Sequence, residues 1–306
     1  MDVFEQLRAG WRLASAVRKQ IFNDKALLFY MVLSTIIIIV EAAAIFGTFI
    51  LVNIPALSAS ASSSSTSNPY ISLEFILLLL LFYVVSSFTS AYVLMALFIA
   101  FKSYTAGNRI SLREALGRTS GYSRLILEWA LFYSVIILLI RLLESRFRGI
   151  GASIVGLIAG VALSIGVMFA LPVIYEQRVG PIKAMKISAS TFVNHFGSSV
   201  GGIVYSDLYG LAIALIGIAA LIALSFLGAA LGSIMFVAIG FLAFLIFIII
   251  GATISSTTSN VFKLLLYDYA SGKDLPTWLD ENLVKTAIRY KRSQAPPPPP
   301  TNAVNY

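Results

Sequence analysis

Six long apolar runs, separated by shorter polar stretches, dominate the chain. Each is about as long as the 20 or so residues that an α-helix needs to cross the ~30 Å hydrocarbon core of a bilayer. The pattern therefore predicts an all-α, polytopic membrane bundle with six transmembrane helices, contained in residues 1–270. The expected spans cover residues 26–52, 71–101, 125–143, 151–175, 200–227 and 233–266.

The polar stretches before spans one, three and five share a second pattern. Apolar residues recur in them near helical spacing and basic residues occupy other positions, which is typical of a helix lying in the headgroup layer. We therefore expect three repeats of an interfacial helix followed by a helical hairpin; the alternative is that any basic loop between spans has this composition. The apolar positions are Phe4, Leu7, Trp11 and Leu13; Leu112, Ala115, Leu116 and Tyr122; and Ile182, Met185, Phe192 and Phe196.

Three further segments complete the predicted layout. Residues 53–70 contain no Lys or Arg and are rich in serine, so we expect a flexible outer loop. Residues 271–292 are expected to form a cytoplasmic amphipathic helix, with Leu279 and Leu283 on one face. Residues 293–306 contain five consecutive prolines and are expected to be a disordered tail, a composition that can also dock in aromatic grooves.

Composition and charge support a membrane location. The chain is 58% hydrophobic and 12% charged, whereas soluble domains carry about a quarter charged residues. The net charge of +8 indicates the orientation of the spans in the membrane rather than nucleic-acid binding. Of the 22 Lys and Arg residues, all but Arg141, Arg146 and Arg148 lie on one predicted side. The positive-inside rule then places both termini in the cytoplasm of a cell-membrane protein.

The sequence offers little catalytic chemistry. It contains no cysteine and one histidine, His195, so thiolate and multi-histidine metal sites are excluded. We interpret His195 as a surface residue, and the serine-rich stretches have no base nearby in sequence that would make them nucleophiles. Phosphate-loop and dinucleotide-binding motifs are missing as well. We therefore expect no enzymatic activity, no cofactor and no metal.

Two charged residues lie deep in predicted spans. Glu41 and Arg141 follow the starts of spans one and three by similar lengths, which places both roughly 22–24 Å from the inner edge. Charges at that depth are costly unless they are paired. We therefore predict a Glu41–Arg141 ion pair, with a local Arg141–Glu144 pair as the alternative.

A third carboxylate, Asp207, lies about two helical turns into span five. It could belong to a proton or cation site. The interpretation that we favour is structural, with Asp207 hydrogen-bonded to a neighbouring helix, because the sequence offers no relay partner.

Span four carries two signals of helix packing. Gly156 and Gly160 form a G-x-x-x-G step, which predicts a close helix contact, either inside the bundle or in a dimer. Pro172 near the end of the same span predicts a kink.

Several stretches next to the spans carry a family resemblance. They are Gly10–Leu13, Asp24–Leu28, Ser111–Leu116, Ile126–Ala130, Leu171–Glu176, Gly180–Ser188 and Val261–Ala270. Together they resemble the domain of unknown function 6159 family, multi-pass membrane proteins of prokaryotes. The resemblance implies a six-span membrane fold and no particular activity. The serine-rich loop and the proline-rich tail depart from the family pattern.

We expect a non-enzymatic membrane component. Its basic inner face would contact membrane lipids, and other membrane proteins or further copies of the chain are candidate partners in an assembly. The alternative is a transporter or channel that uses Glu41, Arg141 and Asp207.

Overall fold

A computed structural model describes residues 3–62, 73–146, 150–194, 196–273, 276 and 278–279. Within these residues every regular element is a helix. Six of the helices are long and apolar enough to cross a membrane, as the hydrophobic pattern predicts. The protein is therefore an all-α bundle of the polytopic membrane class.

The predicted threefold order recurs in the helices, because a shorter helix precedes each of three long hairpins. The first group is α1 (Val3–Asn23), α2 (Ala26–Ser62) and α3 (Leu73–Thr105). The second is α4 (Leu112–Thr119) with the 3₁₀ turn η2 (Ser120–Tyr122), α5 (Ser123–Arg146), α6 (Ile150–Val167) and its continuation α7 (Ala170–Gln177). The third is α8 (Pro181–Asn194), α9 (Phe196–Leu231) and α10 (Ile234–Ala270).

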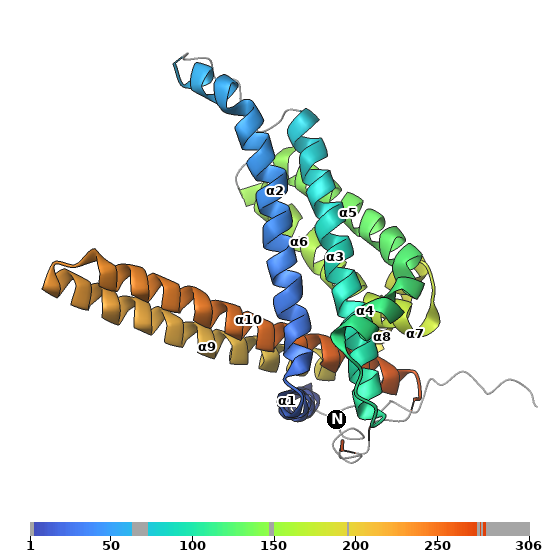
Figure 1. Ribbon diagram of the computed structural model, residues 1–306. Helices are drawn as coiled ribbons and strands as arrows, with labels where there is room; N and C mark the ends of the chain where they lie inside the picture. The colour runs from blue at the N-terminus through green and yellow to red at the C-terminus, as the bar shows by residue number, and fades with distance from the viewer. Residues whose placement is uncertain are drawn as a thin grey trace, which may run out of the picture.

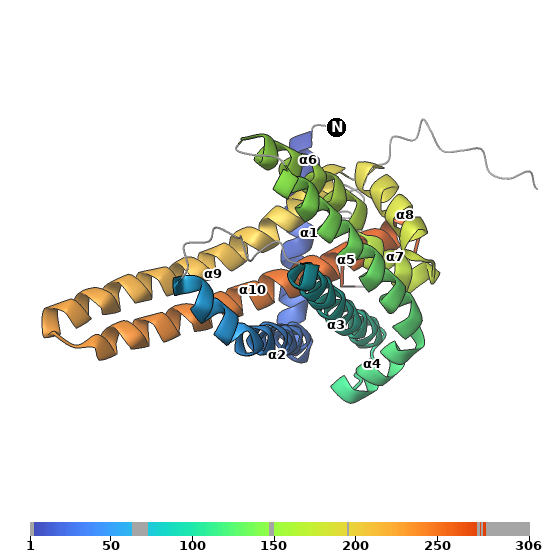
Figure 2. The same cartoon turned by 90° about the horizontal axis from the view of Figure 1, so that it is seen from above.

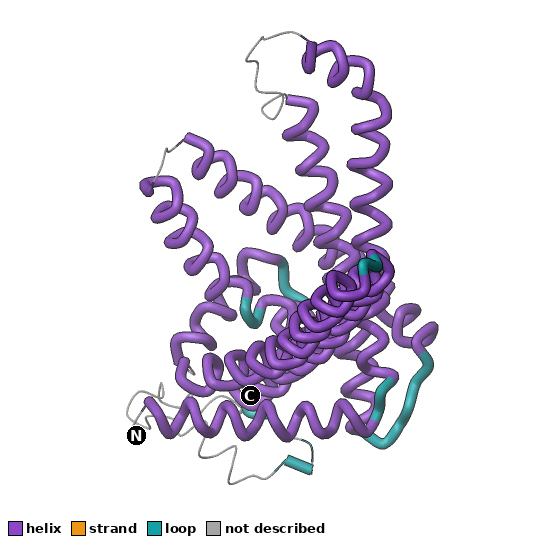
Figure 3. The backbone as a smooth tube through the Cα atoms, turned by 90° about the vertical axis from the view of Figure 1, so that its left-hand side faces the viewer, coloured by secondary structure: helices purple, strands orange, loops and turns teal. Residues whose placement is uncertain are grey.

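The three hairpins leave a shared base in different directions. The base consists of α1, α4, η2, α7 and α8, with the adjoining ends of the long helices. Helix α1 lies across it, and the α9–α10 hairpin extends away from the α2–α3 hairpin (Figures 1 and 2). In the tube view, in which the left-hand side of Figure 1 faces the viewer, the α9–α10 hairpin therefore points toward the viewer (Figure 3).

The buried core is concentrated at this base. In α3 the buried residues fall between Ala91 and Phe101, and in α10 they fall between Gly240 and Asp268, most of them from Gly251 onward. The far parts of the hairpins instead expose large apolar side chains such as Leu77, Phe226 and Phe241. Contiguous exposed apolar surface of this kind suits lipid and not water.

The predicted kink in span four is a break between α6 and α7. Proline lacks an N–H group and its ring clashes with the carbonyl four residues earlier, which here is that of Met168. The helix stops at Val167 and restarts at Ala170. Ser188 of α8 compensates locally, because its hydroxyl accepts a 2.8 Å hydrogen bond from the freed backbone N–H of Phe169.

Some predicted boundaries are wrong. The candidate membrane span in α2, Ala26–Leu51, agrees with the prediction, but the helix itself continues to Ser62. The predicted outer loop therefore begins later, and residues 63–70 lie outside the described residues. Ser271–Lys273 form a turn with Gly272 at φ 75°, so no helix begins at Ser271. His195, residues 280–292 and the tail also lie outside the described residues.

Candidate functional site

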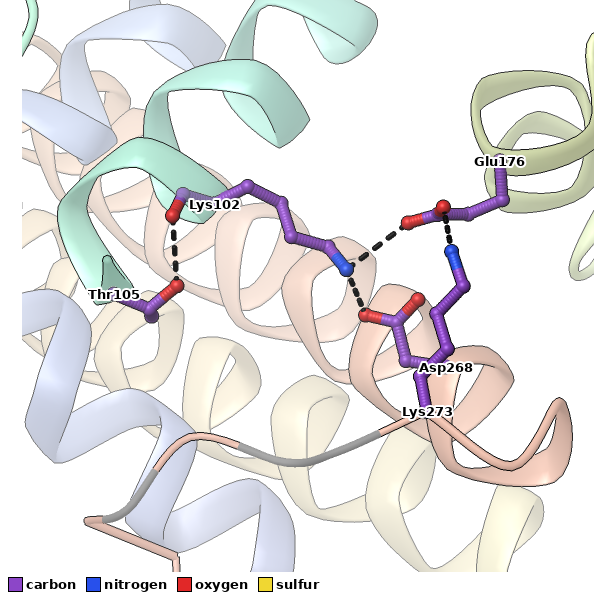
Figure 4. Close-up of polar contacts among 5 residues, drawn as sticks. All are labelled: Lys102, Thr105, Glu176, Asp268 and Lys273. Carbon is purple, nitrogen blue, oxygen red and sulfur yellow. Dashed lines mark hydrogen bonds and ion pairs between the residues drawn. The ribbon is translucent and has the colours of Figure 1, made fainter.

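Charged residues from all three hairpins meet at the base. Lys102 lies in the last turn of α3, Glu176 lies at the end of α7, and Asp268 lies near the end of α10 (Figure 4). The Lys102 ammonium lies 3.0 Å from Oε1 of Glu176 and donates to Oδ2 of Asp268. Lys273, just after α10, donates to Oε2 of Glu176. We call these four residues the junction cluster.

The junction cluster becomes more buried from Lys273 to Asp268. The side chain of Lys273 is 44% exposed, that of Lys102 31%, that of Glu176 12% and that of Asp268 only 3%. The two cations balance the two carboxylates, which makes partial burial of four charges tolerable. Oδ1 of Asp268 is buried and has no hydrogen-bond donor among the described residues.

Aromatic side chains fix the helices that carry the cluster. Gln177 donates a 2.7 Å hydrogen bond to the hydroxyl of Tyr267, which joins α7 to α10. The rings of Tyr122 and Tyr175 lie 5.8 Å apart, and the guanidinium of Arg178 lies 4.6 Å above the Tyr122 ring. These contacts hold the end of α7 between η2 and α10, so the position of Glu176 is determined by its surroundings.

The sequence prediction missed this cluster, although a signal was present. Each hairpin ends at the base with an aromatic residue followed by a charged one: Phe101-Lys102, Tyr175-Glu176 and Tyr267-Asp268. Corresponding positions in the three repeats lie at a similar depth in the membrane. Lys102 can therefore pair with Glu176 and Asp268. The signal depends on the repeat having been recognised first.

A second polar feature is the outward face of α1. Its apolar face is buried in the base through Leu13, Val17 and Ile21. The spacing of Arg8, Arg12 and Lys19 places them together on another face of the helix, where all three are exposed. None of the three forms a salt bridge with a described side chain.

Exposed cations continue onto α8. Lys183 and Lys186 are exposed on this helix and likewise form no salt bridge within the described part of the chain. By contrast, Arg118 and Arg124 pair with Glu114 and Glu128 on their own helices. The base therefore carries some cations that pair with a carboxylate and others that have no acidic partner among the described side chains. Helix α1 holds three of this second kind on one face.

The predicted Glu41–Arg141 ion pair is wrong. Helix α3 packs between α2 and α5 and keeps the two side chains apart. Oε1 of Glu41 accepts a hydrogen bond from Thr89 of α3, while Oε2 is buried without a described donor. Arg141 forms the alternative local pair, with its Nη1 3.0 Å from Oε2 of Glu144.

Asp207 is hydrogen-bonded to the neighbouring helix of its hairpin, as the structural interpretation expects. The Ser255 hydroxyl of α10 donates to Oδ1 of Asp207 at 3.0 Å. Lys263 contributes a longer-range charge interaction and forms no salt bridge with Asp207. Glu41, Arg141 and Asp207 therefore belong to α2, α5 and α9, with separate partners.

The two glycines of the G-x-x-x-G step have different surroundings. A Cβ atom on Gly156 would collide with the carboxylate of Glu144, so this glycine makes room for the α5–α6 contact. Gly160 has no atom within 4 Å of its Cβ position. Within the described part of the chain, only the first half of the predicted packing face makes a contact.

The described residues bring together no set of three His, Asp or Glu side chains suited to holding a metal ion. The charged groups of the base instead form salt bridges and exposed basic surface.

Comparison with known proteins identifies a family. The family of unknown function DUF6159 matches residues 71–275, more than half of the chain and including the junction cluster. The match begins after α2, so the basic α1 lies outside it. Neither a curated protein nor a solved structure matches the chain. The chain therefore belongs to DUF6159, a family of unknown function.

Proposed function

We propose that this protein is a non-enzymatic component of the cell membrane, whose basic cytoplasmic face binds anionic lipid and helps to organise a membrane assembly. The single observation that carries the proposal is the arrangement of α1. This helix is anchored by its buried apolar face and presents Arg8, Arg12 and Lys19 together without described acidic partners.

The proposed orientation follows the positive-inside rule. The base carries the basic residues, so it would face the cytoplasm together with both termini. Inner leaflets carry a negative surface potential, and each Lys or Arg close to it contributes about 1 kcal/mol of binding. Three cations on one face of α1 would then contribute about 3 kcal/mol, which is enough to favour anionic over neutral lipid around the base.

The assembly role draws support from the hairpins. Their far parts diverge and expose large apolar side chains over their length (Figure 1). Lipid satisfies such surfaces, and so do the helices of other membrane proteins or of another copy of the chain. Crosslinking in native membranes followed by identification of the captured chains tests this part of the proposal.

The transporter alternative receives less support. A transport pathway built on Glu41, Arg141 and Asp207 needs these groups to line one route. Helix α3 packs between the helices that carry Glu41 and Arg141, and the three groups have separate hydrogen-bond partners, among them Thr89, Glu144 and Ser255.

Lipid retention in native mass spectrometry tests the proposed binding. The purified chain is mixed with equal amounts of phosphatidylglycerol and phosphatidylcholine in detergent, and the bound lipids are counted. We expect wild type to retain mainly phosphatidylglycerol. The triple variant R8Q/R12Q/K19Q should lose most of that preference, because it removes the three α1 cations that have no acidic partner among the described side chains.

The matched control is R109Q/R118Q/R124Q, which removes the same charge from the base but takes it from cations that already face a carboxylate. It should keep the preference of wild type. Equal losses in both variants would mean that only net charge matters. Unchanged retention in the α1 variant would overturn the proposed role of this face.

A further inference from the structure

Two carboxylates of the junction cluster share one ammonium group. Oε1 of Glu176 lies 3.0 Å from Nζ of Lys102, and Oδ2 of Asp268 accepts a hydrogen bond from the same nitrogen. The two carboxyl groups are thus held next to each other by the nitrogen that they share. Two acidic groups from different hairpins, α7 and α10, are therefore neighbours in a largely buried place.

A hydrogen bond between two carboxyl groups requires a proton on one of them. Ionised carboxylates only accept hydrogen bonds, and like charges at close range disfavour ionisation of both groups. Asp268 is the more deeply placed of the two, and its Oδ1 is buried without a described donor. In Figure 4 this second oxygen lies on the side facing Glu176 and Lys273. A proton on Oδ1 would satisfy the atom and supply a donor for Glu176.

We propose that Glu176 and Asp268 form a proton-binding acid pair at the point where the three hairpins meet. The proton comes from hydronium in the solvent, which leaves a water molecule, and it binds Oδ1 of Asp268. The resulting O–H group donates a hydrogen bond to the Glu176 carboxylate. No other bond is made or broken.

The groups around the pair allow this state. Lys102 faces both carboxylates from α3, and Lys273 faces Glu176 from the turn after α10. The Tyr175 and Tyr122 hydroxyls, from α7 and η2, are the nearby neutral titratable groups. With a proton bound, the cluster keeps two cations and one carboxylate, so it gains one positive charge. Glu176 then remains the counter-ion of both lysines.

Proton uptake would change how the hairpins are joined. In the ionised cluster, Lys102 joins α3 to α10 through Asp268. Neutralising Asp268 weakens that charged hydrogen bond and adds a direct Asp268–Glu176 bond between α10 and α7. Protonation of the acid pair would therefore weaken the contact of the α9–α10 hairpin with α3 and strengthen its contact with α7.

Infrared difference spectroscopy tests the acid pair. Spectra of the full chain in detergent are recorded at about pH 8 and about pH 5, a range in which carboxyl groups with ordinary pKa values near 4 stay mostly ionised. We expect a carboxylic-acid C=O band of about one group per chain to appear at the lower pH. The band should shift when aspartate is labelled with ¹³C at its side-chain carboxyl, and should vanish in D268N and in E176Q.

The matched control is D207N, which removes another membrane-embedded aspartate and should leave the band intact. If D268N fails to fold, the D207N control and the aspartate label in the wild-type chain still test the proposal. Absence of the band from wild type, insensitivity to the aspartate label, or loss of the band in D207N would each overturn the proposal.

Discussion

Arg18 of α1 donates a 2.7 Å hydrogen bond from Nε to the hydroxyl of Tyr205 on α9. The same guanidinium lies 4.2 Å above the ring of Tyr209, one turn further along α9. Trp11 adds an edge-on contact with Tyr205 at 4.9 Å between ring centroids. The basic interfacial helix is therefore attached to the third hairpin through a few specific side chains, besides its apolar face.

The Tyr205 hydroxyl should be the sensitive part of this attachment. The variant Y205F keeps both rings but removes the acceptor of Arg18, and hydrogen bonds to charged groups contribute about 1.5–3 kcal/mol. We expect a lower midpoint of thermal unfolding in detergent, together with faster proteolysis of α1. Y209F is the control, since a phenylalanine ring still lies below the guanidinium. Equal stability of Y205F and wild type would show that the hydrogen bond does not anchor α1.

Close backbone contact in the third hairpin gives a second prediction. A Cβ atom on Gly251 would lie 2.6 Å from the carbonyl oxygen of Gly210, and backbone atoms cannot move aside as a flexible side chain can. We expect G251A to destabilise the chain by about 1–3 kcal/mol, measured as a shift in its detergent-unfolding midpoint.

Gly160 supplies the comparison for that substitution. It is also a glycine within an apolar helix, but nothing lies within 4 Å of its Cβ position. G160A should be neutral or slightly stabilising, because alanine is the better helix former. Destabilisation of G160A as large as that of G251A would point to an intermolecular contact at α6.

The helices were largely predictable from the sequence, because the physics that forms them is local. Unbroken apolar runs dictate spans, and Pro172 follows the break between α6 and α7. Pro55, in contrast, lies inside α2 without ending it. The end of α2 was harder to place. The alanines and leucine after Asn53 favour helix as strongly as the serines suggest a loop, so composition alone does not locate that boundary.

The contacts between helices were less predictable, because they depend on the order in which the hairpins pack. Glu41 and Arg141 do lie at similar depth by residue count, yet depth says nothing about which helix lies between them. Helix α3 occupies that place. The pairing of Lys102 with Asp268, 166 residues further on, follows from the convergence of the hairpins at the base. The short-range pair Arg141–Glu144 was foreseeable because one helix fixes its geometry.

We propose that the chain crosses the membrane six times with its basic base in the cytoplasm. Since the chain contains no cysteine, single-cysteine variants report on one position each. Ser120 in η2 and Ser271 after α10 lie at the base, whereas Ser233 lies in the turn between α9 and α10 at the far end of hairpin three (Figure 1). The measurement is labelling with a membrane-impermeant maleimide in intact cells and in inverted membrane vesicles. We predict that S233C is labelled only in cells, and that S120C and S271C are labelled only in vesicles. Labelling of S120C and S271C from outside the cell, or of all three positions from one side, would contradict the account.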